Sequence, residues 1–332
     1  MSDNFRFALD ADAITRVVPF VLPLKLRFRQ VTSRAGVLVE GPEGWGEFSP
    51  FPDYGPGYAA RWYAAAVDAA TRPLPAPLRD SVPVNTTVPA VDPDVAYGLV
   101  LQSQCRTAKV KVGEPGQDLS QDVARVRAVR AAFDAAGVAD ARIRVDANGA
   151  WDVETAVMAI ARLVRAARGL EYVEQPCASI PELAQVRRRS AVPIAADESI
   201  RTSEDPVKVR DAEAADIIVI KAQPLYGVNA ALEIIASVGL PAVISSAVES
   251  SVGLALGVAL AAAVPELRYD CGLGTASLLA RDVTTTPLLP VDGHLPVGRV
   301  VPDGALEEVT PHEPEATQLL ERFYAAQRAY SG

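Results

Sequence analysis

From about residue 82 onward, the chain alternates short β-branched runs with segments of helical length. The runs that we expect to form strands are Val82–Val88, Ala108–Val112, Ile143–Ala147, Tyr172–Gln175, Ile194–Asp197, Ile217–Lys221, Ala242–Ser245 and Leu267–Asp270. Parallel strands require crossovers of about this length, whereas antiparallel strands are joined by tight turns. Eight such units in succession predict an α/β fold with a (β/α)8-type barrel better than an open doubly wound sheet. No GxGxxG or GxxxxGK[ST] motif follows a strand, which weakens a nucleotide-binding alternative.

The segments between these strands carry helical patterns. Apolar residues separated by three or four positions form one stripe at Leu119, Val123, Val126, Val129 and Phe133. Asp152 is a candidate N-cap for the next helix. The longest apolar run, residues 252–264, is shorter than the roughly 20 residues that a bilayer requires. We therefore expect that run to be a buried helix.

The two ends of the chain differ from this central pattern. Strands are expected at Ile14–Pro19, Leu24–Phe28 and Gly36–Glu40, before a turn-rich segment and a helix over Ala59–Thr71. We expect residues 1–81 to form an α+β capping domain and residues 82–286 to form the barrel. Residues 287–332 are predicted to be a tail, with a helix near Glu315–Ala329, that packs on the capping domain.

Charge and cysteine usage limit the classes of function. The net charge is −9, whereas a nucleic-acid-binding protein needs a basic surface to neutralise phosphates. Cys105, Cys177 and Cys271 have no CxxC spacing, which argues against a disulfide framework or a thiolate metal site. The first residues lack the apolar run of a secretory signal. These features predict a cytoplasmic protein with no nucleic-acid or membrane partner, and they indicate no oligomeric state.

The lysines are few and two of them share a strand. The five lysines stand among 32 basic residues. Lys109 and Lys111 point to one face of their strand, because side chains alternate, and the other face carries Val110 and Val112. The apolar face fits a covering of helices, so the lysines are predicted to point into the barrel. A solvated edge strand is the alternative.

Three later strands each end in an acid: Asp146 in RVDANG, Glu174 in YVEQP and Asp197 in AADES. The spacings of 28 and 23 residues match one strand–helix repeat. Barrel active sites lie at the carboxyl ends of strands, so the acids are expected on one rim. Carboxylates gathered there favour a hard cation such as Mg²⁺. A single acid of this kind is more often a helix cap or a surface residue, but three in phase with the repeat, each after an apolar run, favour the site.

Another lysine follows the three acids at the end of the next strand. Lys221 ends the sixth strand, 24 residues after Asp197, and lies four strands away from Lys111. In an eight-stranded ring the two lysines would face each other across a substrate. That arrangement suits removal of a proton next to a carboxylate, with a metal ion stabilising the negative charge that develops.

The segments TAKVKVG, RVDANGAW, YVEQP, AADES and IVIKAQPLYG resemble the enolase superfamily, in its muconate-lactonising-enzyme subgroup. Members of that superfamily are known to remove a proton next to a carboxylate with a lysine base, while Mg²⁺ stabilises the negative charge that develops. The flanking segments GWGEFSPFPDY, VISSAVESSVGLALG and CGLGTASLLARDV are most similar to actinobacterial dehydratases of menaquinone biosynthesis. The resemblance covers roughly residues 14–290.

This resemblance implies a lyase that removes water, in syn geometry, from a small anionic cyclohexadiene carboxylate. Lys111 would take the α-proton and return it to the departing hydroxyl, and Lys221 would stay protonated on the opposite face. Asp146, Glu174 and Asp197 would hold Mg²⁺. The remaining candidates for substrate contacts are Lys109, Arg144, Asn148, Ser245, Ser246 and Gly272.

Other interpretations remain open. Racemases of N-succinylamino acids and dipeptide epimerases of the same superfamily use the same lysines and metal. A Schiff-base aldolase using Lys109 or Lys221 would not need the three acids, and a non-enzymatic binding protein would need none of these groups. Serines 245 and 246 are equally compatible with a helix N-cap. Arg27 and Arg29 either face an anionic substrate or are solvated.

Overall fold

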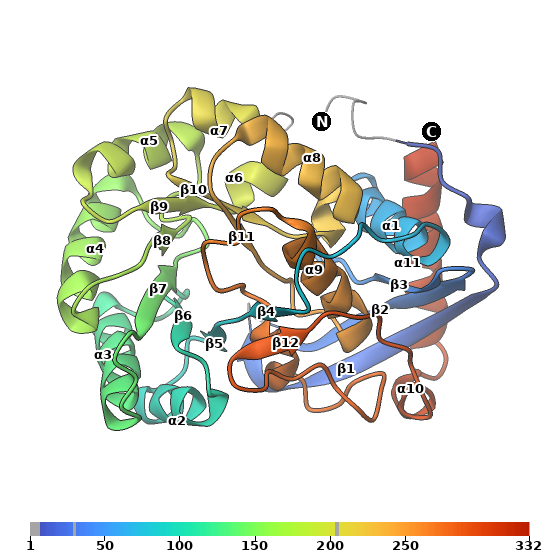
Figure 1. The fold of residues 1–332 in the computed structure, drawn as a ribbon, viewed down its shortest axis with the longest axis horizontal. Helices are drawn as coiled ribbons and strands as arrows, with labels where there is room; N and C mark the ends of the chain where they lie inside the picture. The colour runs from blue at the N-terminus through green and yellow to red at the C-terminus, as the bar shows by residue number, and fades with distance from the viewer. Residues whose placement is uncertain (1–6, 29–30, 203–205, 332) are drawn as a thin grey trace.

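The computed structural model describes residues 7–28, 31–202 and 206–331, and Arg29 lies outside them. Seven parallel strands form one curved sheet. In spatial order they are β5 (Thr86–Val88), β6 (Thr107–Lys111), β7 (Arg142–Asp146), β8 (Val173–Glu174), β9 (Ile194–Ala196), β10 (Ile217–Ile220) and β11 (Ala242–Ile244). Figure 1 shows this sheet beside a second unit that contains both ends of the chain. The order follows the sequence, as a (β/α)8-type barrel requires.

The eighth position of the ring is held by two residues. Cys271 forms a parallel bridge with Val84, and Gly272 forms one with Ser245. Their amides donate to the carbonyls of Pro83 at 2.7 Å and Ile244 at 2.8 Å. The prediction of a strand over residues 267–270 is therefore wrong. This segment pairs with the sheet only at Cys271 and Gly272, where it passes between the segment before β5 and the end of β11. One bridge on each side does not make a continuous strand.

The predicted strand 82–88 is also divided. Its first part, β4 (Ser81–Pro83), pairs antiparallel with β12 (His294–Pro296) of the tail, and only β5 joins the barrel. The amide of Val84 donates to the carbonyl of Gly293 in the tail. Pro83 has no amide hydrogen and cannot donate to a continuing ladder.

Helices connect the strands and cover the outside of the sheet (Figure 1). They are α2 (Pro93–Ser103), α3 (Leu119–Ala135), α4 (Val153–Ala167), α5 (Ile180–Arg189), α6 (Glu198–Arg201), α7 (Val207–Asp211), α8 (Val228–Val238) and α9 (Ser251–Ala263). The predicted stripe of α3 buries Val126, Val129 and Phe133. Asp152 caps α4 by accepting from the amide of Thr155 at 2.7 Å. Almost every residue of α9 is buried, as its apolar run predicts.

The second unit combines both ends of the chain, and we call it the cap. Its elements are β1 (Arg16–Phe28), β2 (Val31–Gly41), β3 (Gly44–Phe48), α1 (Pro56–Thr71), α10 (Ala305–Val309) and α11 (Glu315–Ser331). The three strands form an antiparallel sheet, and α11 lies along α1 (Figure 1). The ring of Phe323 packs on Phe48 at 5.3 Å and on Tyr63 at 5.2 Å, between ring centroids. The tail thus completes the cap.

Two details of the cap differ from the sequence prediction. The segments 14–19 and 24–28 belong to one strand, β1, with a register shift between Pro23 and Phe28. The turn-rich segment contains β3, which was not predicted because its glycines disfavour a strand. Gly46 is needed there, since a Cβ would lie 2.0 Å from the carbonyl oxygen of Ala66 in α1. The domain boundaries at 81/82 and 286/287 stay predictions.

Candidate active site

Three acids stand side by side at the carboxyl ends of neighbouring strands. Asp146 ends β7, Glu174 ends β8, and Asp197 directly follows β9. Asp146 and Glu174 are paired in the sheet register. All three side chains are at most 1% exposed. Removing three carboxylates from water is costly unless positive charge lies near them, so this rim requires cations.

Two of these cations come from β6. The ammonium of Lys109 lies 3.2 Å from both oxygens of Glu174 and 3.5 Å from Asp146. The ammonium of Lys111 donates to Asp146 and, at 2.7 Å, to the side-chain oxygen of Asn148. Both lysines are buried and face the interior of the barrel, on the side that the alternation predicts.

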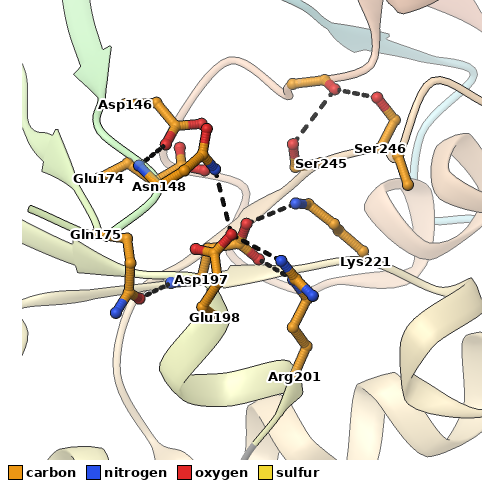
Figure 2. Close-up of polar contacts among 12 residues, drawn as sticks. Asp146, Asn148, Glu174, Gln175, Asp197, Glu198, Arg201, Lys221, Ser245 and Ser246 are labelled. Atoms are coloured by element: carbon orange, nitrogen blue, oxygen red, sulfur yellow. Dashed lines mark hydrogen bonds and ion pairs between the residues drawn. The ribbon is translucent and has the colours of Figure 1, made fainter. Parts of the chain in front are cut away.

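A third lysine approaches from the other side of the ring. Lys221 directly follows β10, which lies four places from β6 in the strand order. Its ammonium donates to Asp197 at 2.6 Å, and Arg201 approaches the other oxygen of that carboxylate at 3.2 Å. Figure 2 shows Lys221 and Arg201 pointing at Asp197 from different sides. The two proposed catalytic lysines therefore lie on facing strands.

The charges shift the ionisation of the acids unequally. Burial favours neutral acids, but Lys111 and Lys109 hold the pKa of Asp146 well below its usual range. Against the same effect of burial, Lys221 and Arg201 lower the pKa of Asp197 to about 2. Burial and the neighbouring charge of Asp146 raise the pKa of Glu174 to about 7, despite the ammonium of Lys109. At Glu174, burial and the charge of Asp146 therefore outweigh the ammonium of Lys109.

The donor set of this rim fits a hard divalent cation, because it offers carboxylate oxygens from three adjacent strands. The raised pKa of Glu174 has the same implication, since added positive charge would keep that acid ionised. In the described part of the chain, no three His, Cys, Asp or Glu side chains are grouped as a ligand set. Lysine ammoniums lie between the acids instead.

Hydroxyl groups line the rim near Lys221. The side chains of Ser245 and Ser246, labelled in Figure 2, both donate to the carbonyl of Gly272, at 3.5 and 2.8 Å. The hydroxyl of Ser246 also bonds that of Thr275 at 2.9 Å. These serines do not cap α9, whose N-cap is Ser250. The structure thus brings Ser245, Ser246 and Gly272 to the same cavity as the three lysines.

The cavity has an inner and an outer part, which share Phe28, Phe51 and Lys111. The inner part, between the lysines and the serines, has a volume of about 20 Å³. The outer part has a volume of about 960 Å³ and also reaches Arg27 and Asn148. Sequence reasoning did not identify the inner lining residues Phe28, Phe51, Thr87, Ala247, Val248 and Thr275. Phe28 and Thr87 had a signal because they lie at or near the ends of predicted strands, and the other four lie in the segments that resemble the family.

Two further unpredicted residues support the rim. Glu198 accepts from Asn148 at 3.2 Å and from Arg201 at 2.7 Å, so it links the groups around Lys111 to those around Asp197 (Figure 2). Arg201 also donates to the hydroxyl of Tyr54 in the cap at 2.8 Å. The spacing of four residues between Asp197 and Arg201 was the available signal, since such pairs meet on a helical turn.

Arg144 lies level with Lys109 in the sheet register, one step of side-chain alternation before Asp146 at the end of β7. Its fully buried guanidinium pairs with Glu171 and donates to the carbonyl of Asp270 at 2.7 Å and to Asn85 at 3.3 Å. It also lies over the ring of Tyr172 at 4.7 Å. The guanidinium of Arg144 makes its hydrogen bonds to other protein groups, and these bonds join neighbouring segments in the interior of the barrel.

Replacement of Arg144 by methionine should destabilise the protein without impairing substrate binding. Loss of the cation leaves the carbonyl of Asp270 without this donor and leaves Glu171 with only the more exposed Arg142, and removal of one partner from a buried pair costs about 3–5 kcal/mol. Chemical denaturation would measure the unfolding free energy, and KM would be measured well below the melting temperature. A large rise in KM with unchanged stability would instead support the substrate contact that the sequence predicts.

Comparison with known proteins gives the family. Residues 19–70 match the family described as enolase N-terminal domain-like, and residues 94–305 match the one described as enolase C-terminal domain-like. The chain is 59% identical over 312 residues to an o-succinylbenzoate synthase of Thermobifida fusca, covering 94% of this chain and 96% of the relative. It is 51% identical over 320 residues to one of Mycolicibacterium smegmatis, covering 96% and 97%.

Solved structures agree in fold. A muconate lactonizing enzyme from Pseudomonas fluorescens aligns with a TM-score of 0.74 at 21% identity, over 90% of this chain and 99% of that one. An L-Ala-D/L-Glu epimerase from Bacillus subtilis aligns with a TM-score of 0.71 at 23% identity, over 87% and 97%. These likenesses concern the fold alone, whereas the relatives above share half or more of the sequence. The chain therefore belongs to the o-succinylbenzoate synthases of the enolase superfamily.

Proposed function

We propose that this chain catalyses the dehydration of 2-succinyl-6-hydroxy-2,4-cyclohexadiene-1-carboxylate to 2-succinylbenzoate, the reaction of its family in menaquinone biosynthesis. It is accordingly a lyase. The observation that carries the proposal is the identity of 48–59% to o-succinylbenzoate synthases over most of the chain. The facing lysines above three buried acids provide groups that suit this chemistry.

Lys111 is the proposed base and acid. It would remove the proton next to the substrate carboxylate, and the same ammonium would then protonate the departing hydroxyl on the same face. One group can serve both steps because the elimination is syn, and the product ring becomes aromatic. Asn148, which accepts from this ammonium at 2.7 Å, would hold Lys111 in place between the two proton transfers.

Lys221 is proposed to act by its charge. It is 7% exposed and lies on the strand that faces Lys111 across the ring. An ammonium on this side would favour the negative charge that develops on the substrate carboxylate and would contact the face of the ring. Ser245, Ser246 and Gly272, next to Lys221 in the inner cavity, are proposed to contact the succinyl carboxylate.

Asp146, Glu174 and Asp197 are the residues that would hold Mg²⁺. When bound, the ion would stabilise negative charge on the substrate carboxylate. Lys109 lies between two of these acids and would balance their charge. Arg27, an exposed cation that lines the outer cavity, is suited to an anionic small molecule.

A direct assay tests the function and its closest alternative. Purified protein with Mg²⁺ is expected to convert the cyclohexadiene substrate to 2-succinylbenzoate, with loss of activity after chelation by EDTA and recovery when Mg²⁺ is restored. N-succinylamino acids and dipeptides, followed by polarimetry, test the racemase and epimerase alternatives, which would use the same two lysines. Efficient racemisation without dehydration would contradict the proposal, and activity that persists in EDTA would contradict the metal role.

The cellular setting is proposed from the same features. The three cysteines are buried and free, as expected of a reducing compartment. Across the described residues, no helix has both the length and the apolar character needed to span a bilayer. We propose a cytoplasmic location and a small-molecule substrate as the partner, without nucleic acid.

A further inference from the structure

Two charged side chains of the cap are buried against the barrel. Arg34, on β2, is 2% exposed, and Glu47, on β3, is fully buried. Both reach the segment 248–253, which runs from the wall of the inner cavity into α9. A buried charge is costly unless several polar groups satisfy it. The hydrogen-bond partners of Arg34 and Glu47 therefore identify the segments that these two side chains hold together.

Arg34 joins two parts of the cavity wall. Its Nε donates to the carbonyl of Val248 at 3.2 Å, and another guanidinium nitrogen donates to the carbonyl of Ser49. The guanidinium also lies over the ring of Phe51, with 4.0 Å to the centroid. Phe51 and Val248 both line the inner cavity, although nearly 200 residues separate them. One side chain thus sets the distance between a cap residue and a barrel residue of that wall.

Glu47 holds the same two segments from a second point. Its carboxylate accepts from the hydroxyl of Ser49 at 2.6 Å, and from the hydroxyl and amide of Ser250. It also accepts from the amide of Gly253, in the first turn of α9, at 2.9 Å, while burial raises the pKa of Glu47 to about 7. A Cβ at Gly253 would lie 2.6 Å from this carboxylate, so the close approach requires glycine.

The segment that these residues hold is strained. Val248 has a φ of 61°, in the left-handed region that β-branched residues rarely adopt. Such a conformation persists only where surrounding contacts enforce it, and these positions gather at functional sites. Arg34 holds the carbonyl of Val248, and Glu47 holds the amides that follow it. Without them, the segment would relax away from its position in the wall.

We propose that Arg34 and Glu47 are positioning residues that set the shape of the substrate cavity by holding Phe51 and Val248 in place. They contribute to substrate affinity and take no part in proton transfer. This inference rests on the proposed function, because it assigns the cavity, its inner and outer parts together, to the substrate. We call the pair, together with Ser49 and segment 248–253, the cap clamp.

The variants Arg34→Met and Glu47→Ala test the cap clamp, with Arg79→Met as the matched control. Arg79 donates to the carbonyls of Ala261, Ala262 and Val264, and so it contacts the far end of α9 without touching the clamp. The measurements are the Kd for 2-succinylbenzoate by calorimetry, and KM and kcat for dehydration, at a temperature well below every melting temperature.

The clamp variants should raise Kd and KM about tenfold or more, because a preorganised wall is lost, while kcat changes much less. Arg79→Met should lower the melting temperature and leave Kd near that of the wild type. Glu47→Gln should recover most of the affinity lost in Glu47→Ala, because its amide oxygen still accepts from the amide of Gly253. Arg34→Lys, which keeps the charge and loses the flat guanidinium over Phe51, should give an intermediate Kd.

Two results would overturn the inference. One is a Kd within twofold of wild type in Arg34→Met and Glu47→Ala, and the other is an equal rise in Arg79→Met. If Arg34→Met and Glu47→Ala fail to fold, Arg34→Lys and Glu47→Gln are measured in their place. A wild-type Kd in both of these variants would then overturn the inference. A wild-type protein that neither binds 2-succinylbenzoate nor dehydrates the substrate would instead remove the proposed function.

Discussion

Replacement of Lys111 by alanine should reduce dehydration by about 10⁴-fold, at the upper end of what a positioned acid–base group contributes. The effect should be large because the same amine would serve both proton transfers, and the neighbouring lysines are held by other acids. Lys109 is engaged with Glu174 and Asp146, and Lys221 is engaged with Asp197. Neither is free to replace the lost base. The measurement is kcat with saturating substrate and Mg²⁺.

Two companion variants distinguish a base from a charge. Lys111→Arg keeps a cation next to Asp146 but cannot release its proton, so it should be as inactive as Lys111→Ala. Lys208→Ala removes an exposed lysine of α7 and should leave kcat unchanged. Circular dichroism and Mg²⁺ calorimetry should show that Lys111→Ala keeps its fold and its ion affinity. Near-normal turnover in Lys111→Ala or Lys111→Arg would show that the base lies elsewhere.

Replacement of Asp197 by asparagine should chiefly weaken Mg²⁺ binding. Loss of a direct carboxylate ligand should reduce affinity by more than the roughly 10–100-fold that follows loss of a supporting contact. Asp197 also pairs with Lys221 and Arg201, so Lys221 loses its paired carboxylate and Arg201 keeps only Glu198. A buried pair that loses one partner costs about 3–5 kcal/mol, and the unfolding free energy should fall accordingly. Calorimetric titration with Mg²⁺, without substrate, measures the affinity independently of turnover.

Glu198→Gln is the matched control for Asp197→Asn. Glu198 is adjacent in sequence and also pairs with Arg201, but it is outside the proposed ligand set. Glu198→Gln should lower Mg²⁺ affinity by no more than the roughly 10–100-fold that follows loss of a supporting contact. Equal Mg²⁺ affinity in Asp197→Asn and the wild type would mean that the ion, if bound, uses other oxygens.

The general architecture was accessible from the sequence because its signals are local. The alternation of strands and helices follows from side-chain periodicity, and acids at strand ends fall on one rim in any barrel of parallel strands. The spacing of two residues sends Lys109 and Lys111 to one side of β6. Closure of the ring was predicted as an ordinary strand and was found as bridges at Cys271 and Gly272. No local pattern marks residues that pair only at one point.

The surroundings of the site depended on contacts between distant segments. Arg144 lies on the same face of β7 as Asp146, and its buried guanidinium contacts Glu171 and the carbonyl of Asp270, while its substrate contact stays a prediction. The inner cavity also takes Phe51 from the cap, in a segment that the sequence showed as rich in turns and similar to the family, without placing it at the site.

What the sequence by itself determined is the barrel-and-cap class of fold and the order in which the lysines and acids follow one another around the ring. These depend on spacing along the chain, which residue type and periodicity record directly. Only the tertiary structure decided which charges meet, how the ring closes, and that Arg34 and Glu47 hold a strained segment some 200 residues away. Such contacts arise when the cap packs on the barrel, and their energy comes from burying charges together, which no single segment encodes.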